Sequence, residues 1–247
     1  MAAAARAASA ASPVWDVSSS TLLWVQPAGP AVHRYDPASG RDDAISLPQH
    51  VAHAHPRVRG GLVVHLLDGV AVLDPSGDRR WLVYWAREAA RAGAAAVGPS
   101  GELWVGNGDW LARVEPDGAA TVVLRDVAID GLAYDTEAGR LYLAGAGRIE
   151  VLEPGAAGPQ ALCDVGSRPG GLCVDAEGAV WVAVPGAVRR YLPAGVLDDE
   201  VLVRGAPPTG CAFGGPRLTD LYVTTADGSL LVLAGAGTGA PTPIFAG

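Results

Sequence analysis

The chain has 247 residues, of which 49% are apolar and 18% are charged, a balance that supplies a buried core and excludes a wholly disordered chain. The net charge of −8, without any basic run, argues against nucleic-acid binding, which depends on lysine and arginine at phosphates. No stretch approaches the roughly 18 uninterrupted apolar residues of a membrane-spanning helix, so no membrane contact is expected.

Residue types that are missing or scarce exclude further chemistry. All 18 cations are arginine, which rules out a lysine Schiff base and a phosphate-loop lysine. The three cysteines, Cys163, Cys173 and Cys211, form no C-x-x-C pair, and their odd number argues against a disulfide framework. A reducing, cytoplasmic setting is therefore expected.

The first twelve residues, MAAAARAASAAS, carry alanine where a secretion signal would have a leucine-rich core. We expect residues 1–12 to form a flexible alanine-rich leader. The alternative is that this segment lies along an edge strand.

From residue 13 onward, one pattern recurs: a short apolar run, a polar turn that usually contains glycine, and a second apolar run. The residues that open the second run are spaced by 38 to 41 positions, namely Leu22, Leu62, Leu103, Leu141, Val180 and Leu221. A period near forty residues is typical of β-propellers, in which every repeat is one four-stranded blade. The sequence therefore predicts an all-β, six-bladed propeller over residues 13–247, with blades at about 13–46, 52–85, 93–126, 129–164, 170–204 and 209–246.

The fifth repeat illustrates the strands expected within a blade. Runs rich in valine, leucine and aromatic residues, bounded by glycine, proline and aspartate, indicate strands. They lie at Gly171–Val174, Val180–Val184, Ala187–Leu192 and Glu200–Arg204. The single helical-looking stretch, AREAARA at 86–92, links the second and third blades and is expected to form a turn or two at most.

Segments of most repeats resemble the successive blades of the senescence-marker-protein, gluconolactonase and luciferin-regenerating-enzyme family, which includes regucalcin. The likeness is carried by SPVWD from Ser12, HRYDPASG from His33, GPSGELWVG from Gly98, DGLAYD from Asp130, GGLCVDAEGAVWVA from Gly170 and TGCAFGG from Thr209. The resemblance implies a six-bladed propeller with one divalent cation, often calcium, in its axial channel. It also implies hydrolysis of lactones and related esters.

The resemblance also implies where the cation's ligands belong. The family's ligand positions fall on Ala11, Gly93, Asp130 and Gly170, and an arginine that contacts substrate in some members corresponds to Arg91. A hard divalent cation prefers six or more oxygen ligands. Because three of the four positions carry no side-chain oxygen, we expect the family's metal site to be absent and any calcium or zinc binding to be weak.

Asp130 is the best candidate for a catalytic group, because it is the one ionisable residue among the expected starts of the innermost strands. An isolated carboxylate in a narrow channel can act as a general base or acid. The alternative is a structural aspartate that caps a turn. Arg91, Asp109, Trp110 and Thr209 are candidate substrate contacts, with Trp110 as a stacking wall and Arg91 as a clamp on a carbonyl or carboxylate.

Two further groups of residues have competing interpretations. His53 and His55 form an H-x-H pair with His50 and His65 nearby, which suits a zinc site, but they fit contact between blades at least as well. Cys173 and Cys211 occupy matching places in the fifth and sixth repeats and are expected in the core. No G-x-S-x-G nucleophile elbow is present.

Three functions remain open at this stage. The first is a metal-independent enzyme that acts on a small carbonyl or lactone-type substrate by hydrolysis, cyclisation or isomerisation, with Asp130 transferring a proton. The second is a divalent-metal lactone hydrolase with a rebuilt ligand set of Asp130, Asp109 and a histidine. The third is a non-catalytic propeller that binds a small molecule or a protein. The sequence gives neither the substrate nor the oligomeric state.

Overall fold

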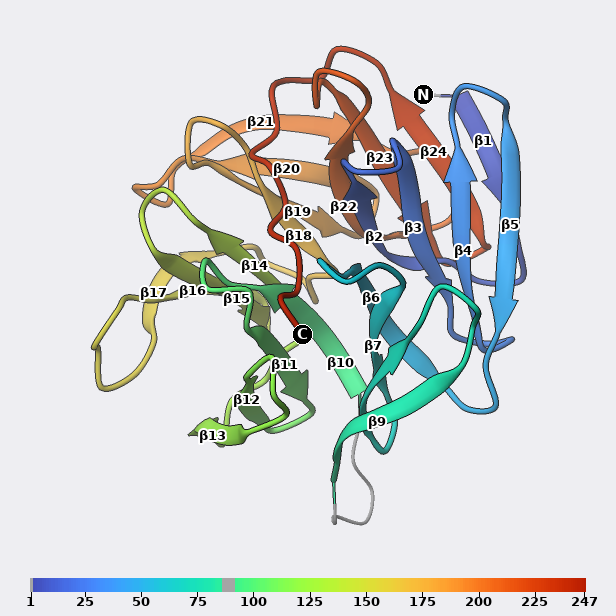
Figure 1. The fold of residues 1–247 in the computed structure, drawn as a ribbon. Coiled ribbons are helices and arrows are strands. Elements are labelled where there is room, and N and C mark those ends of the chain that lie inside the picture. Colours follow the sequence, from blue (N-terminus) through green and yellow to red (C-terminus); the bar gives the residue numbers. More distant parts are fainter. Residues whose placement is uncertain (1, 86–91) are drawn as a thin grey trace.

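The computed structural model describes residues 2–85 and 92–247, and these residues form six four-stranded antiparallel sheets arranged in a ring (Figure 1). The predicted six-bladed β-propeller is therefore confirmed. No helix occurs among the described residues, and hence none that could cross a membrane. The predicted turn of helix at 86–92 falls almost wholly on residues 86–91, which lie outside the described part, and Ala92 already begins a strand.

Within each blade the strands follow one another from the axis outward. Blade 1 contains β2 (Ala11–Asp16), β3 (Thr21–Gln26), β4 (Ala31–Asp36) and β5 (Arg41–Ser46). Blade 2 contains β6 (Val51–Pro56), β7 (Leu62–Leu66), β8 (Gly69–Leu73) and β9 (Arg79–Tyr84). Blade 3 contains β10 (Ala92–Val97), β11 (Leu103–Asn107), β12 (Trp110–Val114) and β13 (Ala120–Arg125).

The remaining blades follow the same order. Blade 4 contains β14 (Gly131–Asp135), β15 (Arg140–Gly145), β16 (Arg148–Leu152) and β17 (Gln160–Asp164). Blade 5 contains β18 (Leu172–Val174), β19 (Val180–Val184), β20 (Ala187–Tyr191) and β21 (Leu197–Leu202). Blade 6 contains β22 (Pro208–Gly214), β23 (Asp220–Thr225), β24 (Ser229–Leu233) and β1 (Ala2–Arg6).

The second strand of every blade contains one of the repeat-opening apolar residues, and in each case this residue is buried in the core. The six repeat-opening residues identified in the sequence all lie on these second strands and are at most 2% exposed. Strands close to the axis are apolar on both faces because each face packs on a neighbouring blade, as in β19 with the sequence VWVAV. The outer strands β5, β13 and β21 are largely exposed and accordingly polar or charged at many positions.

Aspartates at the ends of the inner strands fix the tight turns that follow. Asp135 Oδ1 accepts hydrogen bonds from the amides of Glu137 and Ala138, and Asp175 Oδ1 accepts from those of Glu177 and Ala179. An aspartate side chain that binds amides two to four residues onward makes such turns locally stable. In blades 4 and 5 these turns precede the second strand and so help to set its register against the first.

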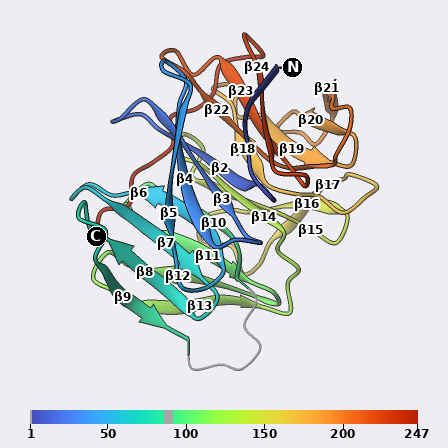
Figure 2. The same cartoon turned by 90° about the vertical axis from the view of Figure 1, so that its right-hand side faces the viewer.

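The N-terminal segment completes the sixth blade. Strand β1 pairs antiparallel with β24, with Ala2 opposite Val232 and Arg6 opposite Ser229. Of the two expectations for residues 1–12, a leader or an edge strand, the structure shows the edge strand for Ala2–Arg6. This pairing makes β1 the outermost strand of blade 6, beside β24, so that one sheet combines an N-terminal strand with three strands from late in the chain (Figure 2).

In blade 5 the observed strands match three of the four predicted segments to within one residue at either end. The fourth, β21, begins three residues before the predicted start, because the acidic segment Asp198–Glu200 pairs with Arg189 and Arg190 of β20. An exposed outer strand does not need an apolar sequence, which is why the composition gave no signal for its start.

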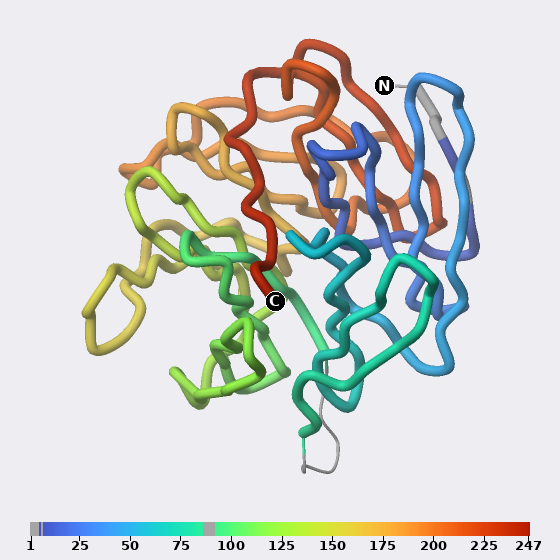
Figure 3. The backbone as a smooth tube through the Cα atoms, viewed as in Figure 1, coloured from blue at the N-terminus to red at the C-terminus, as the bar shows by residue number. Residues whose placement is uncertain are grey.

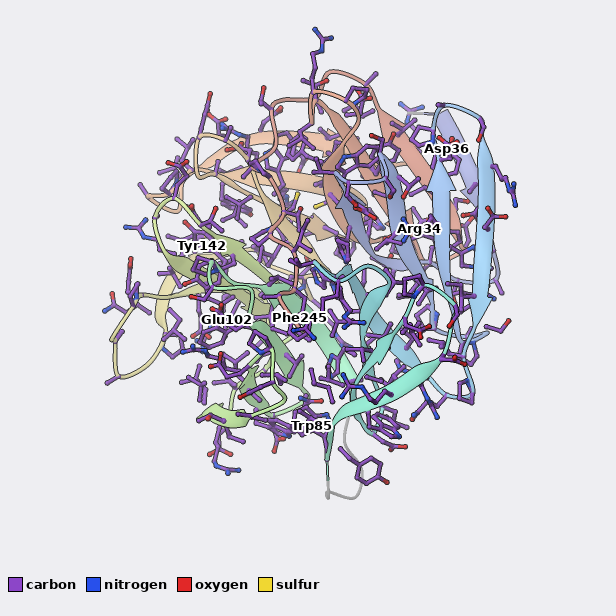
Figure 4. The ribbon with its side chains drawn as sticks, viewed as in Figure 1. Arg34, Asp36, Trp85, Glu102, Tyr142 and Phe245 are labelled. Atoms are coloured by element: carbon purple, nitrogen blue, oxygen red, sulfur yellow. The ribbon has the colours of Figure 1, made fainter. Side chains whose placement is uncertain are left out.

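The C-terminal segment crosses one face of the ring near its middle (Figure 3). The Ala176 amide donates to the carbonyl of Thr238, the Phe245 amide to that of Pro56, and the Ala246 amide to that of Gly101. These bonds connect the segment to blades 5, 2 and 3 in turn. Phe245 itself is fully buried near the centre of the ring (Figure 4), so the segment is part of the core.

Candidate functional site

The innermost strands of the six blades surround an axial cavity of about 260 Å³. Its wall is formed mostly by small or apolar residues of β2, β6, β10, β14, β18 and β22, and by the C-terminal segment from Ala240 to Pro243. Asp130 is the one aspartate, glutamate or arginine among the described residues of the wall. The cavity is therefore largely apolar, with one carboxylate and a few neutral polar side chains, which is typical of small-molecule sites.

Asp130 lies immediately before β14 and borders the cavity, as the sequence predicts, but it is not an isolated carboxylate. Its Oδ1 accepts two hydrogen bonds from Arg168, from Nε at 3.1 Å and from Nη2 at 2.5 Å. The Asp130 side chain is 21% exposed and that of Arg168 is 83% exposed. Bonding to the carboxylate raises the pKa of Arg168, so the guanidinium stays charged.

The ion pair leaves polar atoms of both residues available. Among the described residues, no group bonds to Oδ2 of Asp130 or to Nη1 of Arg168. A carboxylate oxygen accepts hydrogen bonds and a guanidinium nitrogen only donates them. The pair thus presents an acceptor and a donor at one place, next to the cavity.

A second hollow of about 1030 Å³ adjoins the axial cavity on the side of Asp130. The two share Ala92, Gly93 and Asp130, and Arg168 borders the outer one. Seven of the twelve residues around the outer hollow are glycine or alanine, so it is wide because its side chains are small. We call the outer hollow the entrance groove and the shared boundary at Asp130 the mouth of the cavity.

The residues at the family's ligand positions do not suit a divalent cation. Ala11, Gly93 and Gly170 offer no side-chain oxygen, and Oδ1 of Asp130 is bound by a guanidinium. A Cβ atom at Gly170 would lie 2.6 Å from the carbonyl oxygen of Thr209, so this position has no room for an aspartate without movement of the backbone. No group of three or more histidine, cysteine, aspartate or glutamate side chains among the described residues could hold a metal ion. Calcium prefers six to eight oxygen ligands, which this mouth does not provide.

The other predicted substrate contacts have different surroundings. Thr209 borders the cavity, but its hydroxyl lies 2.6 Å from the carbonyl of Ala10 and 2.9 Å from the hydroxyl of Thr224. Asp109 is exposed and follows Gly108, which borders the entrance groove. Trp110 is 4% exposed and packs edge-on against Trp85 in the core, away from both hollows.

Arg91, the predicted clamp, lies outside the described residues, so the structure gives no view of its side chain. Arg168, which the structure brings to Asp130, had no sequence signal of its own. The two are 38 positions apart in loops of different blades, and only the ring places them together.

The histidines lie between blades 2 and 3, at the edge of the axial cavity. Nε2 of His65 on β7 is 3.0 Å from Oδ1 of Asn107 on β11, which joins the two blades. His50, His53 and His55 border the cavity itself. The expected inter-blade hydrogen bond is therefore observed for His65 and not for the H-x-H pair of His53 and His55, for whose rings no side-chain hydrogen bond is found among the described residues.

The matching cysteines lie between blades 5 and 6, where Cys211 is buried as expected, but Cys173 is only partly buried, and both border the axial cavity. Sγ of Cys173 lies 3.7 Å from Sγ of Cys211, which in turn lies 3.4 Å from the carbonyl oxygen of Trp181. The neighbouring thiol and burial raise the pKa of Cys173 well above its usual range. A thiol that stays protonated is a poor nucleophile, so Cys173 is not an activated nucleophile.

Comparison with known proteins shows similarity along most of the chain. The family model described as "SMP-30/Gluconolactonase/LRE-like region" matches residues 9–227. A 6-deoxy-6-sulfogluconolactonase of Pseudomonas putida is 31% identical over 237 residues, which cover 86% of this chain and 81% of the relative. Pentonolactonase XacC of Haloferax volcanii is 29% identical, with 87% and 81% covered.

Solved structures show the same fold. A luciferin-regenerating enzyme superposes with a TM-score of 0.89 at 22% identity, covering 98% of this chain and 96% of that one. A calcium-binding protein, regucalcin, of Agrobacterium tumefaciens also gives 0.89, at 21% identity and with 98% and 95% covered. Because both structures are less than 25% identical to this chain, the comparison shows a shared fold, the six-bladed propeller, and nothing about activity.

Proposed function

Because the chain belongs to the SMP-30/gluconolactonase/LRE-like family, we propose that it is a lactonase-like enzyme for a small organic substrate that works without the family's divalent cation. Two relatives are named for lactone hydrolysis, a sulfogluconolactonase and a pentonolactonase. The observation that carries the metal-independent part is the bonding of Asp130 Oδ1 by Arg168 at the mouth of the cavity.

Asp130 serves as the proton-transfer group in this proposal. Its Oδ2 takes a proton from a water molecule whose oxygen attacks the carbonyl carbon of the lactone, and the carbonyl oxygen becomes an oxyanion. The bond between the carbonyl carbon and the ring oxygen then breaks, and the ring oxygen receives the proton from Asp130. The product is the open hydroxy acid, and the carboxylate of Asp130 is regenerated.

Arg168 supplies the positive charge that the reaction needs. Its Nη1 has no partner among the described residues and donates to the developing oxyanion, while Nε and Nη2 hold Asp130 in place. A positively charged donor placed at the oxyanion stabilises the negative charge that develops in the transition state. In this way one ion pair provides both the base and the electrophilic group.

The test is lactone hydrolysis by the purified full-length protein, followed with a pH indicator on five- and six-membered sugar lactones, with and without excess chelator. We expect turnover to persist in chelator and to fall by about 10²- to 10⁴-fold in Asp130→Asn. Asp43→Asn, which breaks the exposed pair of Arg41 and Asp43 on β5, is the matched control and should retain activity.

Each other outcome points to one of the competing functions. Loss of turnover in chelator, with recovery on adding calcium or zinc, would support a rebuilt metal site. Tight binding of a lactone with no acid released would support a non-catalytic binding protein. Full activity in Asp130→Asn would remove this carboxylate from the mechanism.

A further inference from the structure

The segment after β24 lies at the end of the axial cavity that is opposite to the mouth. The mouth lies where innermost strands begin, since Asp130 comes directly before β14. The segment instead bonds where such strands end. The Ala240 amide donates to the carbonyl of Val174, the last residue of β18, and the Phe245 amide donates to that of Pro56, the last residue of β6. The five residues of β14 span roughly 17 Å, which is the approximate distance between the two ends.

Residues 240–245, which we call the strap, are fixed to the fold on both sides of the cavity. On one side, the Gly239 amide donates to the carbonyl of Leu218 at 2.7 Å. On the other side, Phe245 is fully buried in the apolar core between blades 2 and 3, and its carbonyl accepts from the Val58 amide at 2.9 Å. The strap is therefore held across the end of the cavity.

The middle of the strap crosses the cavity without bonds of its own. Ala240–Pro243 border the cavity. No described residue forms a hydrogen bond with the backbone of residues 241–244. Pro241 and Pro243 have no N–H to donate, and their rings fix φ, so this part of the chain is extended and stiff. The strap thus forms a wall that is apolar apart from Thr242.

The side chains beside the strap are apolar as well. Val97, Val174 and Phe213 lie at or next to the ends of β10, β18 and β22, and all three border the cavity. A molecule that enters past Asp130 therefore meets these side chains and then the strap. Burial of apolar groups is favourable, so an apolar substituent suits this end of the cavity.

We propose that the strap is the floor of a blind chamber: a substrate enters and leaves past Asp130, and the floor limits the length of the substituent that extends inward from the reacting carbonyl. This inference rests on the proposed function in one respect, the placement of the reacting carbonyl at Asp130. Phe245 is a positioning residue in this proposal, because it holds the strap in place without bordering the cavity itself.

Titration calorimetry on the full-length protein tests the floor with 2-alkylcyclopentanones, ring ketones that carry a carbonyl but cannot be hydrolysed. The probes carry propyl, pentyl, heptyl and undecyl chains. In the wild-type protein we expect the affinity to rise from propyl to heptyl by up to about fourfold for each added methylene. The undecyl probe should bind no more tightly than the heptyl probe, because the longer chain meets the strap.

Three results in the wild-type protein would overturn the proposal. An affinity that continues to rise up to the undecyl probe would mean that the cavity is open at the strap. An affinity that does not change with the chain would mean that the substituent stays outside the chamber. Absence of binding by every probe would mean that the cavity does not accept such molecules.

Variants locate the length limit on the strap. The double variant Pro241→Gly/Pro243→Gly loosens the strap without removing a buried side chain, and the undecyl probe should then bind at least about tenfold more tightly than the heptyl probe. Phe245→Ala, which releases the strap, should have the same effect. Pro154→Gly/Pro159→Gly, in the loop between β16 and β17 and away from the cavity, is the matched control and should keep the limit. A limit that persists in the folded strap variants would contradict the floor, and the wild-type series decides the matter if neither variant folds.

The outcome is separable from that of the proposed function, because binding of the ketones needs no turnover. A length limit without lactone hydrolysis would contradict the enzyme and leave the floor. Lactone hydrolysis without a length limit would contradict the floor and leave the enzyme.

Discussion

Two blade interfaces that occupy equivalent positions in the ring differ in chemistry close to the axis. Between blades 2 and 3 the inner positions are His53, His55 and His65, with Asn107 across the interface. Between blades 5 and 6, Trp181 packs edge-on against Phe213, with ring centroids 5.4 Å apart, in an apolar cluster that includes Cys211. The fold accepts either chemistry, but the polar interface buries side chains that are costly to desolvate, whereas the apolar one buries side chains that stabilise the fold.

The largest effect on stability is expected at the apolar interface. Trp181→Ala removes a side chain that is 2% exposed and whose indole nitrogen donates to Oδ2 of Asp175 at 2.9 Å. We expect the free energy of unfolding to fall by about 3–5 kcal/mol. Chemical denaturation measures the free energy of unfolding, and Val122→Ala, at an exposed position of β13, is the control. Equal losses of stability in the two variants would mean that the interface between blades 5 and 6 does not stabilise the fold more than an exposed outer strand does.

The second-largest effect is expected from acid, which should lower the free energy of unfolding by protonating the histidines between blades 2 and 3. Burial lowers the pKa of both His55 and His65 to about 4, so the unfolded chain binds protons more readily than the folded one between about pH 6.5 and pH 4. Stability should thus be complete above pH 6.5 and decline as the pH falls through this window, by up to about 1.4 kcal/mol per pH unit for each ring. Unfolding free energies at half-unit steps give the slope, and a slope that is the same in His55→Leu would contradict the assignment to His55.

The smallest expected effect is a gain in stability, produced by replacing His55 with leucine. His55→Leu replaces a ring with two unpartnered nitrogens by an apolar side chain of similar size, so the free energy of unfolding at pH 7 should rise by about 1 kcal/mol. Thermal and chemical unfolding both report it. A clear destabilisation would show that the His55 nitrogens have partners in solution, such as ordered water, that leucine cannot replace.

The architecture could be predicted from the sequence because it is repeated. The apolar residue that opens each second strand recurs at a nearly fixed interval, and blade-on-blade packing requires an apolar residue there in all six blades. The position of Asp130 at the mouth followed from the same alignment of repeats.

The side chains that complete the site could not be predicted in this way, because they depend on contacts between blades. Arg168 reaches Asp130 from the next blade, and Asn107 meets His65 across an interface. Trp110 shows the reverse: a loop position suggested a binding wall, but the following strand β12 carries this side chain into the core beside Trp85. Loop arginines and strand-end aromatics are placed by tertiary packing, which local patterns do not encode.

The pairing of β1 with β24 has a consequence for how the protein is made. Ala2–Arg6 is synthesised long before its partner residues Ser229–Val232. At about 5–20 residues per second, this strand has no partner for roughly 10–50 s, while β24 is not yet available. A nascent chain with five finished blades is therefore still an open arc with unpaired edges, and it becomes a closed disc only after β24 has been synthesised.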